Sequence, residues 1–296
     1  MSPALRAYVF LILTAMMWGG NAVAGKLAVG HISPMLLTMT RWIMAFALMM
    51  AFAWPQVRRD WHIIRRHLPF LVLLGAIGFA AFNLLFYTAL QYTTAINVAI
   101  VQGAMPAIIF LVNFVLFKIR ASTAQIFGFM ITLFGVTIVA GQGSFARLLA
   151  LEVNFGDALM LIAVVIYGSY TVALRFKPDI HWQSMMTVLS ASALVMTIPF
   201  AIWEIASGAV IWPDARGFGA AAYTAIFPSL ISQVLYIKGI DIIGSNRAGL
   251  FVNLVPIFGT LMSVAILSEA LHLYHVLALT LVIGGIALAE RRKSQI

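Results

Sequence analysis

The polar side chains inside the apolar segments of this sequence are mostly amides and hydroxyls, and many stand near aromatic residues. Phe79, Asn83 and Tyr87 recur every four residues, which places them on one face of a helix. A similar pattern returns later in Ser229, Gln233 and Tyr236. An amide flanked by aromatic rings suits a small amphipathic molecule, because a ring stacks on its flat part while the amide fixes its orientation. The alternative is hydrogen bonding between helices, which amides also provide within membranes.

Polar and aromatic residues in other apolar segments extend this candidate cavity. Amides are costly in hydrocarbon, so we expect them to face protein or water rather than lipid. The further residues expected to line the cavity are Trp18, Asn21, Gln102, Tyr167, Tyr170, Thr171 and Asn253. A small-molecule substrate is the partner that such a lining implies.

Glycine and proline interrupt several of the same segments. A proline inside a helix removes one hydrogen bond and kinks the axis, and glycine either loosens a helix or admits close packing. The sequence predicts a hinge at Gly103 and Pro106, inside the stretch QGAMPAIIFLVN, and another at Pro256. For Gly19 and Gly20 a hinge and a tight packing seam are both open interpretations.

Arg41 is the one strong charge well inside an apolar segment. An ion at such a depth is rare and is a functional candidate by default. It either attracts a substrate carboxylate or extends outward to the lipid headgroups, and the second interpretation is favoured. Lys26 and Arg175 lie near segment ends and are expected to extend outward as well.

Several kinds of chemistry have no matching pattern in the sequence. No Asp or Glu falls at the middle of an apolar segment, so we expect transport that is not coupled to protons. The pair His272 and His275 lacks the rest of a zinc motif, and no phosphate-binding G-x-x-x-x-G-K-[ST] loop occurs. We therefore expect no cofactor and no metal, and we keep a membrane-embedded enzyme only as a remote alternative.

The elements that must position these residues are long apolar runs. Hydrophobic residues make up 63% of the 296 residues and charged residues only 9%, which is typical of a polytopic membrane protein. Counting runs of about 20 residues predicts ten transmembrane helices. They are expected at 7–29, 35–54, 68–90, 94–117, 122–141, 155–174, 182–204, 217–239, 245–267 and 272–290.

The formal net charge of +9 comes from short basic clusters between these runs, so it indicates topology rather than nucleic-acid binding. The clusters occur in alternate connections, for example Arg58 and Arg59 after the second run and Lys118 and Arg120 after the fourth. The positive-inside rule then predicts that both termini are cytoplasmic. We expect the membrane to be a bacterial inner (plasma) membrane. The sequence leaves the oligomeric state open, with a monomer as one option.

The runs also divide into two sets of five, at 1–143 and 144–296. An odd number in each set makes the second set enter the membrane from the opposite side. Pro106 then aligns with Pro256, and Asn83 with Gln233. The basic residues of aligned connections fall on opposite sides, as an inverted repeat requires.

With Trp18-Gly19-Gly20-Asn21 in the first run and a mid-helix proline in each half, the chain resembles the EamA family of the drug/metabolite transporter superfamily over nearly its whole length. Within that family it looks most similar to the bacterial amino-acid exporters of the YddG type. The resemblance implies an all-α, basket-like fold whose cavity is lined by the first, third, fourth, sixth, eighth and ninth helices.

The resemblance also implies export of amino acids, aromatic and related ones such as Met, or of similar small metabolites by alternating access. The alternative is proton-coupled drug or metabolite efflux. A passive channel is less favoured, because channels usually repeat one pore element around an axis.

Overall fold

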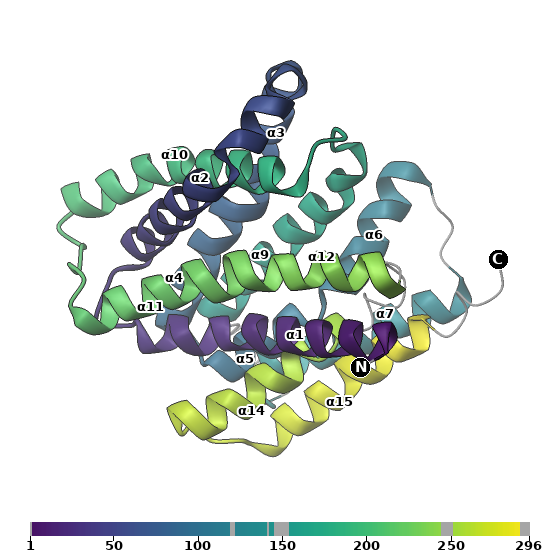
Figure 1. Cartoon of the computed structure of the whole chain (residues 1–296). Coiled ribbons are helices and arrows are strands. Elements are labelled where there is room, and N and C mark those ends of the chain that lie inside the picture. The colour runs from purple at the N-terminus through teal and green to yellow at the C-terminus, as the bar shows by residue number, and fades with distance from the viewer. Residues whose placement is uncertain (1, 119–121, 141, 145–153, 244–250, 291–296) are drawn as a thin grey trace.

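The computed structural model describes residues 2–118, 122–140, 142–144, 154–243 and 251–290. Within these ranges the chain is helical and contains no strand. Figure 1 shows the helices gathered into one bundle. The first half contains α1 (Pro3–Leu27), α2 (Pro34–Arg66), α3 (Leu68–Gly75), η1 (Ala76–Ala81), α4 (Phe82–Tyr92), α5 (Ala95–Gln102), α6 (Met105–Phe117) and α7 (Thr123–Ala140). The second half contains α9 (Phe155–Ala173), η2 (Leu174–Phe176), α10 (Trp182–Ala206), α11 (Ala215–Ile226), η3 (Phe227–Ile231), α12 (Ser232–Ile243), α14 (Val255–Leu267) and α15 (Leu273–Glu290).

The helices are long and apolar enough for a membrane. In the described ranges, 7 helical stretches meet the length and hydropathy of a membrane span, and shorter apolar helices cover Thr123–Val139, Val255–Leu267 and Leu273–Leu288. Large apolar side chains stand on the outside of the bundle, among them Phe52, Phe127, Trp203 and Leu273. An outer surface of this kind is expected where lipid replaces water as the solvent.

Helix α2 is longer than predicted. The sequence placed its end at residue 54 and the following arginines in a connection, but the helix continues through Pro55 to Arg66. Two local features support the extension. Arg65 and Arg66 stand in the last turn, where positive charge favours the helix dipole. The Gln56 amide donates to the Asp60 carboxylate one turn later, at 3.2 Å.

Each half carries the same three departures from regular α-helix, 150 residues apart. The chain forms π-helix at η1 and again at η3. It turns at residues 103–104 and again at 253–254. Left-handed residues end α6 at Lys118 and α14 at Ser268, each with φ of 55°.

The sequence analysis expected Pro106 and Pro256 to kink continuous helices, and this expectation was wrong. Pro106 and Pro256 instead occupy the first turn of new helices, α6 and α14. Proline is favourable there because its missing N–H would have no partner within the helix. The turn at residues 103–104 separates α6 from α5, and the turn at 253–254 precedes α14 in the same way. The helix is therefore interrupted at both positions.

Helix packing follows the same division. Helices α7 and α15 pack together at one side of the bundle, and α2 and α10 pack together at another (Figure 1). Between them α1 packs against α12 and α14, and α9 packs against α4 and α6. This set of contacts is unchanged when each helix of the first half is exchanged for the equivalent helix of the second: α1 for α9, α2 for α10, α4 for α12, α6 for α14 and α7 for α15.

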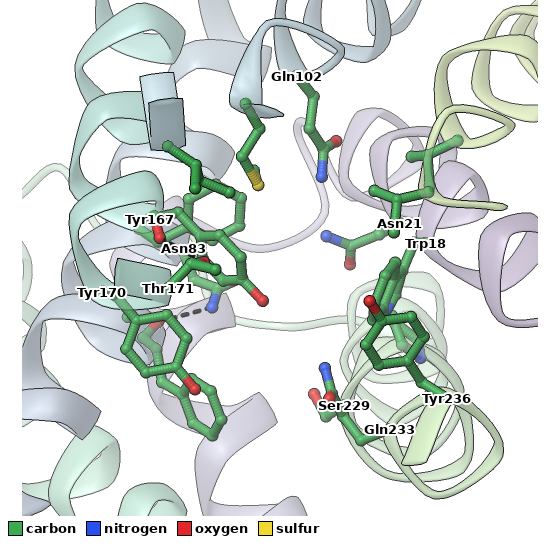
Figure 2. Close-up of a pocket in the computed structure, with 18 of the residues that line it drawn as sticks. Trp18, Asn21, Asn83, Gln102, Tyr167, Tyr170, Thr171, Ser229, Gln233 and Tyr236 are labelled. Atoms are coloured by element: carbon green, nitrogen blue, oxygen red, sulfur yellow. Dashed lines mark hydrogen bonds between the residues drawn. The ribbon is translucent and has the colours of Figure 1, made fainter. Parts of the chain in front are cut away.

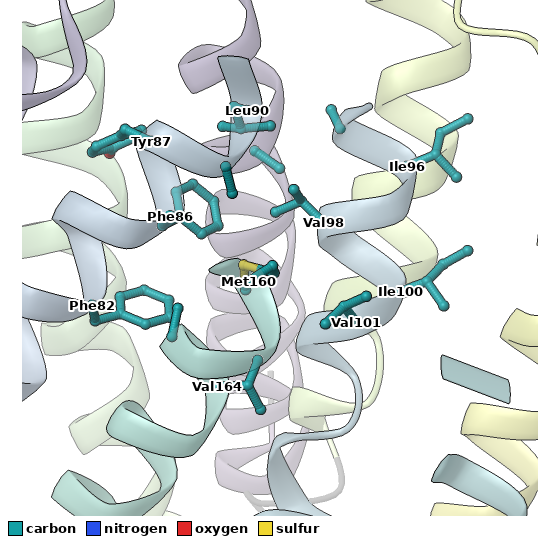
Figure 3. Close-up of a cluster of buried hydrophobic side chains, with 14 of the residues drawn as sticks. Phe82, Phe86, Tyr87, Leu90, Ile96, Val98, Ile100, Val101, Met160 and Val164 are labelled. Atoms are coloured by element: carbon teal, nitrogen blue, oxygen red, sulfur yellow. The ribbon is translucent and has the colours of Figure 1, made fainter. Parts of the chain in front are cut away.

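A buried apolar cluster holds the middle of the bundle together. Figure 3 shows Phe82 and Phe86 of α4 against Met160 and Val164 of α9, with Val101 of α5 close by. Burying large apolar side chains contributes about 1.5–3 kcal/mol each when water is the reference solvent, and close packing provides the attraction when lipid is. The cluster fixes α4, α5 and α9, three of the helices that carry the predicted polar residues.

Candidate functional site: a central cavity

A cavity of about 250 Å³ lies at the centre of the bundle. Its lining includes nearly all of the predicted cavity residues: Trp18, Asn21, Phe79, Asn83, Gln102, Tyr167, Tyr170, Thr171, Ser229, Gln233, Tyr236 and Asn253. Tyr87 lies behind this wall and donates a hydrogen bond to Asn21 Oδ1 at 2.9 Å. The structure therefore brings together side chains from segments that are up to 235 residues apart in the sequence.

The predicted hinge residues are placed differently from one another. Gly103 and Pro256 line the cavity. A Cβ atom added to Gly19 would lie 2.7 Å from the backbone nitrogen of Gly259, so this glycine permits close packing of α1 on α14. Gly20 faces the hydroxyl of Tyr223. The side chain of Pro106 lies outside the described residues.

Aromatic rings form two facing walls of the cavity. On one side the ring centroids of Phe82 and Tyr167 are 4.8 Å apart, and those of Tyr167 and Tyr170 are 5.2 Å apart. On the other side Trp18 and Tyr236 are in contact, with centroids 5.2 Å apart. Figure 2 shows the tyrosines of α9 on one side and Trp18 and Tyr236 on the other. A flat apolar group fits between such walls.

Arg41 does not extend to the headgroups, so the favoured interpretation of this residue was wrong. Its side chain is buried, with 4% exposed, and it lines the cavity. Its Nε donates to Ser229 Oγ at 2.8 Å, and its Nη1 donates to Asn83 Oδ1 at 2.7 Å and to the hydroxyl of Tyr87. These hydrogen bonds inside the bundle replace the hydration that the guanidinium would otherwise find in the headgroup region.

The two π-helices position these partners. In η3 the Ser229 hydroxyl donates to the carbonyl of Thr224, five residues earlier, at 2.8 Å. Directly after η1, Asn83 donates to the carbonyl of Phe79 at 2.6 Å, which turns its own oxygen toward Arg41. A π-helix widens the backbone and is often found at functional sites.

The charge of Arg41 is not balanced by a carboxylate in the part of the chain that the structure describes. Within those residues the ion pair between His31 and Asp214 is the single one formed, and it lies on the surface. Arg41 is also the one charged residue of the described cavity lining. The site therefore combines aromatic walls, neutral amides and hydroxyls, and one positive charge.

The interpretation of Lys26 also needs correction. Its ammonium donates to the carbonyls of Leu90 and Thr93, at 2.9 and 2.7 Å, and so satisfies the end of α4. Arg175 behaves in a similar way: it donates to Asn113 Oδ1 at 3.0 Å and lies over the Phe117 ring. Both cations bind neighbouring helices.

Sequence reasoning missed a group of buried polar residues away from the cavity. Asp157 lies near the start of α9, as expected, but its side chain is fully buried. It accepts from Thr93 Oγ1 at 2.7 Å and from Asn97 Nδ2 at 3.2 Å. The Nε2 of His275 donates to Asn97 Oδ1 at 3.1 Å, since its Nδ1 accepts from the His272 amide. Thr93 lies four residues before Asn97, and His272 three before His275, but nothing in the sequence links these two pairs to each other or to Asp157.

Trp42 is a further cavity residue that the sequence analysis did not single out. Its ring stacks on Phe79 with a centroid separation of 4.8 Å, and its indole N–H has no hydrogen-bond partner among the described residues. Its position directly after Arg41 was the available signal. No group of three or more His, Cys, Asp or Glu side chains comes together as a metal site in the described ranges.

This architecture is that of a multi-pass membrane protein, and comparisons with known proteins assign its class. Residues 5–141 and 154–290 each match the EamA-like transporter family. The chain belongs to this family of transporters.

Two relatives match along nearly their whole length. The chain is 26% identical over 293 residues to "Uncharacterized transporter YyaM" of Bacillus subtilis (strain 168), covering 97% of this chain and 94% of the relative. It is 25% identical to an "Uncharacterized transporter" of Archaeoglobus fulgidus, covering 98% and 99%. A solved structure described as "Crystal structure of protein" superposes with a TM-score of 0.64 at 20% identity, covering 96% of each chain, and this shows a shared fold.

Proposed function

We propose that this transporter exports amino acids, aromatic and related apolar ones such as Met, or similar small metabolites, through the central cavity. The observation that supports the proposal is the lining itself, where aromatic walls and amide side chains surround a volume of about 250 Å³. Ligand pockets for small molecules usually measure about 300–1,000 Å³, so this cavity suits a molecule of amino-acid size.

Alternating access is the proposed mechanism, and the two halves are its proposed basis. The paired π-helices, helix breaks and left-handed ends support two repeats of five membrane helices, 1–143 and 144–296. If these repeats are inverted, with both termini at the cytoplasmic face of the inner membrane, the structure that closes one side has a counterpart on the other.

The helix breaks are the proposed pivots. At residues 103–104 and 253–254 the regular α-helix is replaced by a turn beside the cavity, so α6 and α14 can rotate while α5 stays packed in the apolar core. The turnover of a Gly103→Ala variant is expected to fall, because its Cβ would lie 2.7 Å from Val282 Cγ1 and 2.9 Å from Pro256 Cγ. Unchanged turnover would argue against this pivot.

Uncoupled transport remains our proposal, while one observation favours proton coupling as the second candidate. Asp157 is fully buried and connects through Asn97 to His275. Buried titratable groups within a membrane often serve proton relays. In this structure they lie outside the cavity lining, which is why the uncoupled mechanism is preferred.

The test is counterflow in proteoliposomes that contain the purified protein. Vesicles loaded with unlabelled Phe, Trp or Met should accumulate the labelled amino acid transiently, and protein-free vesicles should not. At zero voltage, an imposed proton gradient should leave the initial rate unchanged. A rate that rises steeply with the gradient, and that loses this response in Asp157→Asn, would replace uncoupled transport by proton coupling. Absence of counterflow with every amino acid would reject amino acids as substrates.

A further inference from the structure

Arg41 carries a charge that the described part of the cavity leaves unpaired. Its hydrogen-bond acceptors are the oxygens of Asn21, Asn83, Tyr87 and Ser229, and all of them are neutral. A charge moved from water into a protein interior is strongly penalised unless a counter-ion and hydrogen bonds compensate it. Here the hydrogen bonds are present, and the described residues supply no counter-ion.

The guanidinium also has donors left over. Nε and Nη1 are bound to protein, whereas Nη2 has no hydrogen-bond partner among the described residues. Because Arg41 lines the cavity while 4% exposed, these N–H groups are available to a molecule inside it. A guanidinium nitrogen with both N–H groups unused is a strong, charge-assisted donor to a carboxylate. In Arg41 that nitrogen is Nη2, because Nε and Nη1 already donate to protein oxygens.

We infer that the cavity binds a small organic monoanion, a carboxylate attached to an apolar or aromatic body. The carboxylate accepts hydrogen bonds from Nη2, while Nε keeps its bond to Ser229 and the Ser229 hydroxyl keeps its bond to the Thr224 carbonyl. The body lies against the rings of Trp42, Phe79 and Tyr170. The inference rests on the proposed function, since it takes the cavity to be the transport site. It narrows the substrate to the similar small metabolites that carry a carboxylate and no ammonium.

The same lining distinguishes three charge types that share one body. An ammonium group would need acceptors, and the described lining supplies amide, hydroxyl and phenol oxygens but no carboxylate. A zwitterion therefore gains one ion pair and leaves its ammonium without one. A cation gains no ion pair from the described lining and is repelled by Arg41. The expected order of affinity is monoanion, then zwitterion, then cation.

The charge also affects the transport cycle. A cavity with a bound monoanion is electrically neutral at Arg41, whereas the empty cavity retains a buried positive charge. The loaded protein should therefore change between its two orientations faster than the empty one. Exchange of anions across the membrane should exceed net efflux.

The test compares probes with one phenyl ring and different charges, bound to the purified full-length protein: 3-phenylpropanoate, phenylalanine, phenethylamine and the uncharged 3-phenylpropanamide. Binding is measured by calorimetry at pH 7. The propanoate should bind about tenfold more tightly than the amide, since ionised hydrogen bonds are about twice as strong as neutral ones. Equal binding of these two on the unaltered protein would overturn the inference without any variant.

Variants then assign the effect to Arg41. Arg41→Gln should remove the preference for the propanoate over the amide, and Arg41→Lys should restore part of it. Arg58→Gln is the matched control, because this arginine lies on the same helix with its side chain exposed. It should leave the preference unchanged. A folded Arg41→Gln protein that keeps the full preference would contradict the inference.

The remaining outcomes separate this inference from the proposed function. Tighter binding of phenylalanine than of the propanoate would reject the monoanion and keep the amino-acid transporter. Binding of inorganic phosphate as tightly as the propanoate would reject a carboxylate with an apolar body. If phenylalanine and the propanoate both fail to bind and no counterflow occurs, the cavity is not a site for either class.

Discussion

The cavity contains a buried arginine. The end of the bundle near residues 28–33, 93–94, 207–214 and 268–272 contains the buried Glu204 and the half-buried Glu269, and these charges have different surroundings. At that end Glu204 accepts from the amide of Leu36 at 3.0 Å and from the Ser33 hydroxyl at 2.5 Å. Glu269 accepts from the amides of Ala95 and Ile96, at 2.8 and 2.9 Å. Each carboxylate thus caps the positive end of a helix from another segment.

In the cavity, by contrast, the described partners of Arg41 are neutral side chains, and none of these hydrogen bonds goes to a helix end. The difference teaches how one fold can use buried charge in two ways. A charge matched by a helix terminus fastens helices together, and a charge that faces the cavity without a counter-ion is available to a ligand. The carboxylates at the bundle end should therefore govern stability, and Arg41 should govern transport.

The largest expected effect is on transport. Arg41→Gln should lower the rate of substrate counterflow about 100-fold, equivalent to about 3 kcal/mol for a lost charge-assisted contact. Its stability should change little, because Asn83 and Ser229 retain hydrogen bonds to the carbonyls of Phe79 and Thr224. Counterflow and thermal unfolding are measured on the same preparation. Normal transport by the variant, or its failure to fold, would contradict the claim that Arg41 governs transport while the carboxylates at the bundle end govern stability.

The next effect is on stability. Glu204→Ala removes the acceptor from Ser33 and from the amides of Met35 and Leu36, so the free energy of unfolding should fall by about 3 kcal/mol. Glu204→Gln is the matched control, because it keeps an acceptor and loses only the charge. It should lose about half as much. Equal stability of Glu204→Ala and the parent in denaturant titration would show that the cap does not fasten α2.

A smaller effect is expected at Gly78, where the missing side chain leaves room for the Tyr170 ring. A Cβ at Gly78 would collide with the ring of Tyr170, so Gly78→Ala should displace that ring and weaken substrate binding about tenfold. Gly219→Ala is the control, since nothing lies within 4 Å of its added Cβ. Binding is measured by calorimetry with the substrate identified by counterflow. Equal affinity in the two variants would separate the Tyr170 ring from the binding site.

The smallest effect concerns the surface cap of α11. The amide of Gly217 and then the side chain of His31 hold the pKa of Asp214 below its ordinary value. A lowered carboxyl pKa stabilises the fold at pH values above the unfolded pKa of about 3.9, and this is lost as the pH falls through the folded value.

The unfolding temperature of Asp214→Ala should therefore lie below that of the parent at pH 6, and the two should converge as the pH falls below 4. Asp214→Asn, which keeps a capping oxygen, is the control. A difference that persists unchanged at low pH would mean that the charge of Asp214 contributes nothing.

Much of the architecture follows from local pattern. Runs of apolar residues predicted the membrane helices, and a spacing of four placed Phe79 and Asn83 on one face, where the structure has both in the cavity lining. The exceptions have local causes that hydropathy does not contain. Helix α2 passes Pro55 because its polar end is stabilised by charge, and Pro106 lies in the first turn of α6 because a turn precedes that helix.

The sequence by itself determined a membrane protein of helices and the residue types that a cavity could use, because these depend on composition and on spacing along one helix. Only the tertiary structure decided where Arg41 points and what it meets, since Asn21, Asn83 and Ser229 reach it from three other helical segments. It also decided that Asp157, Asn97 and His275 join in one buried group. The effect of a charge in a low-dielectric interior depends on the groups around it. These groups are distant in sequence, so local periodicity cannot predict them.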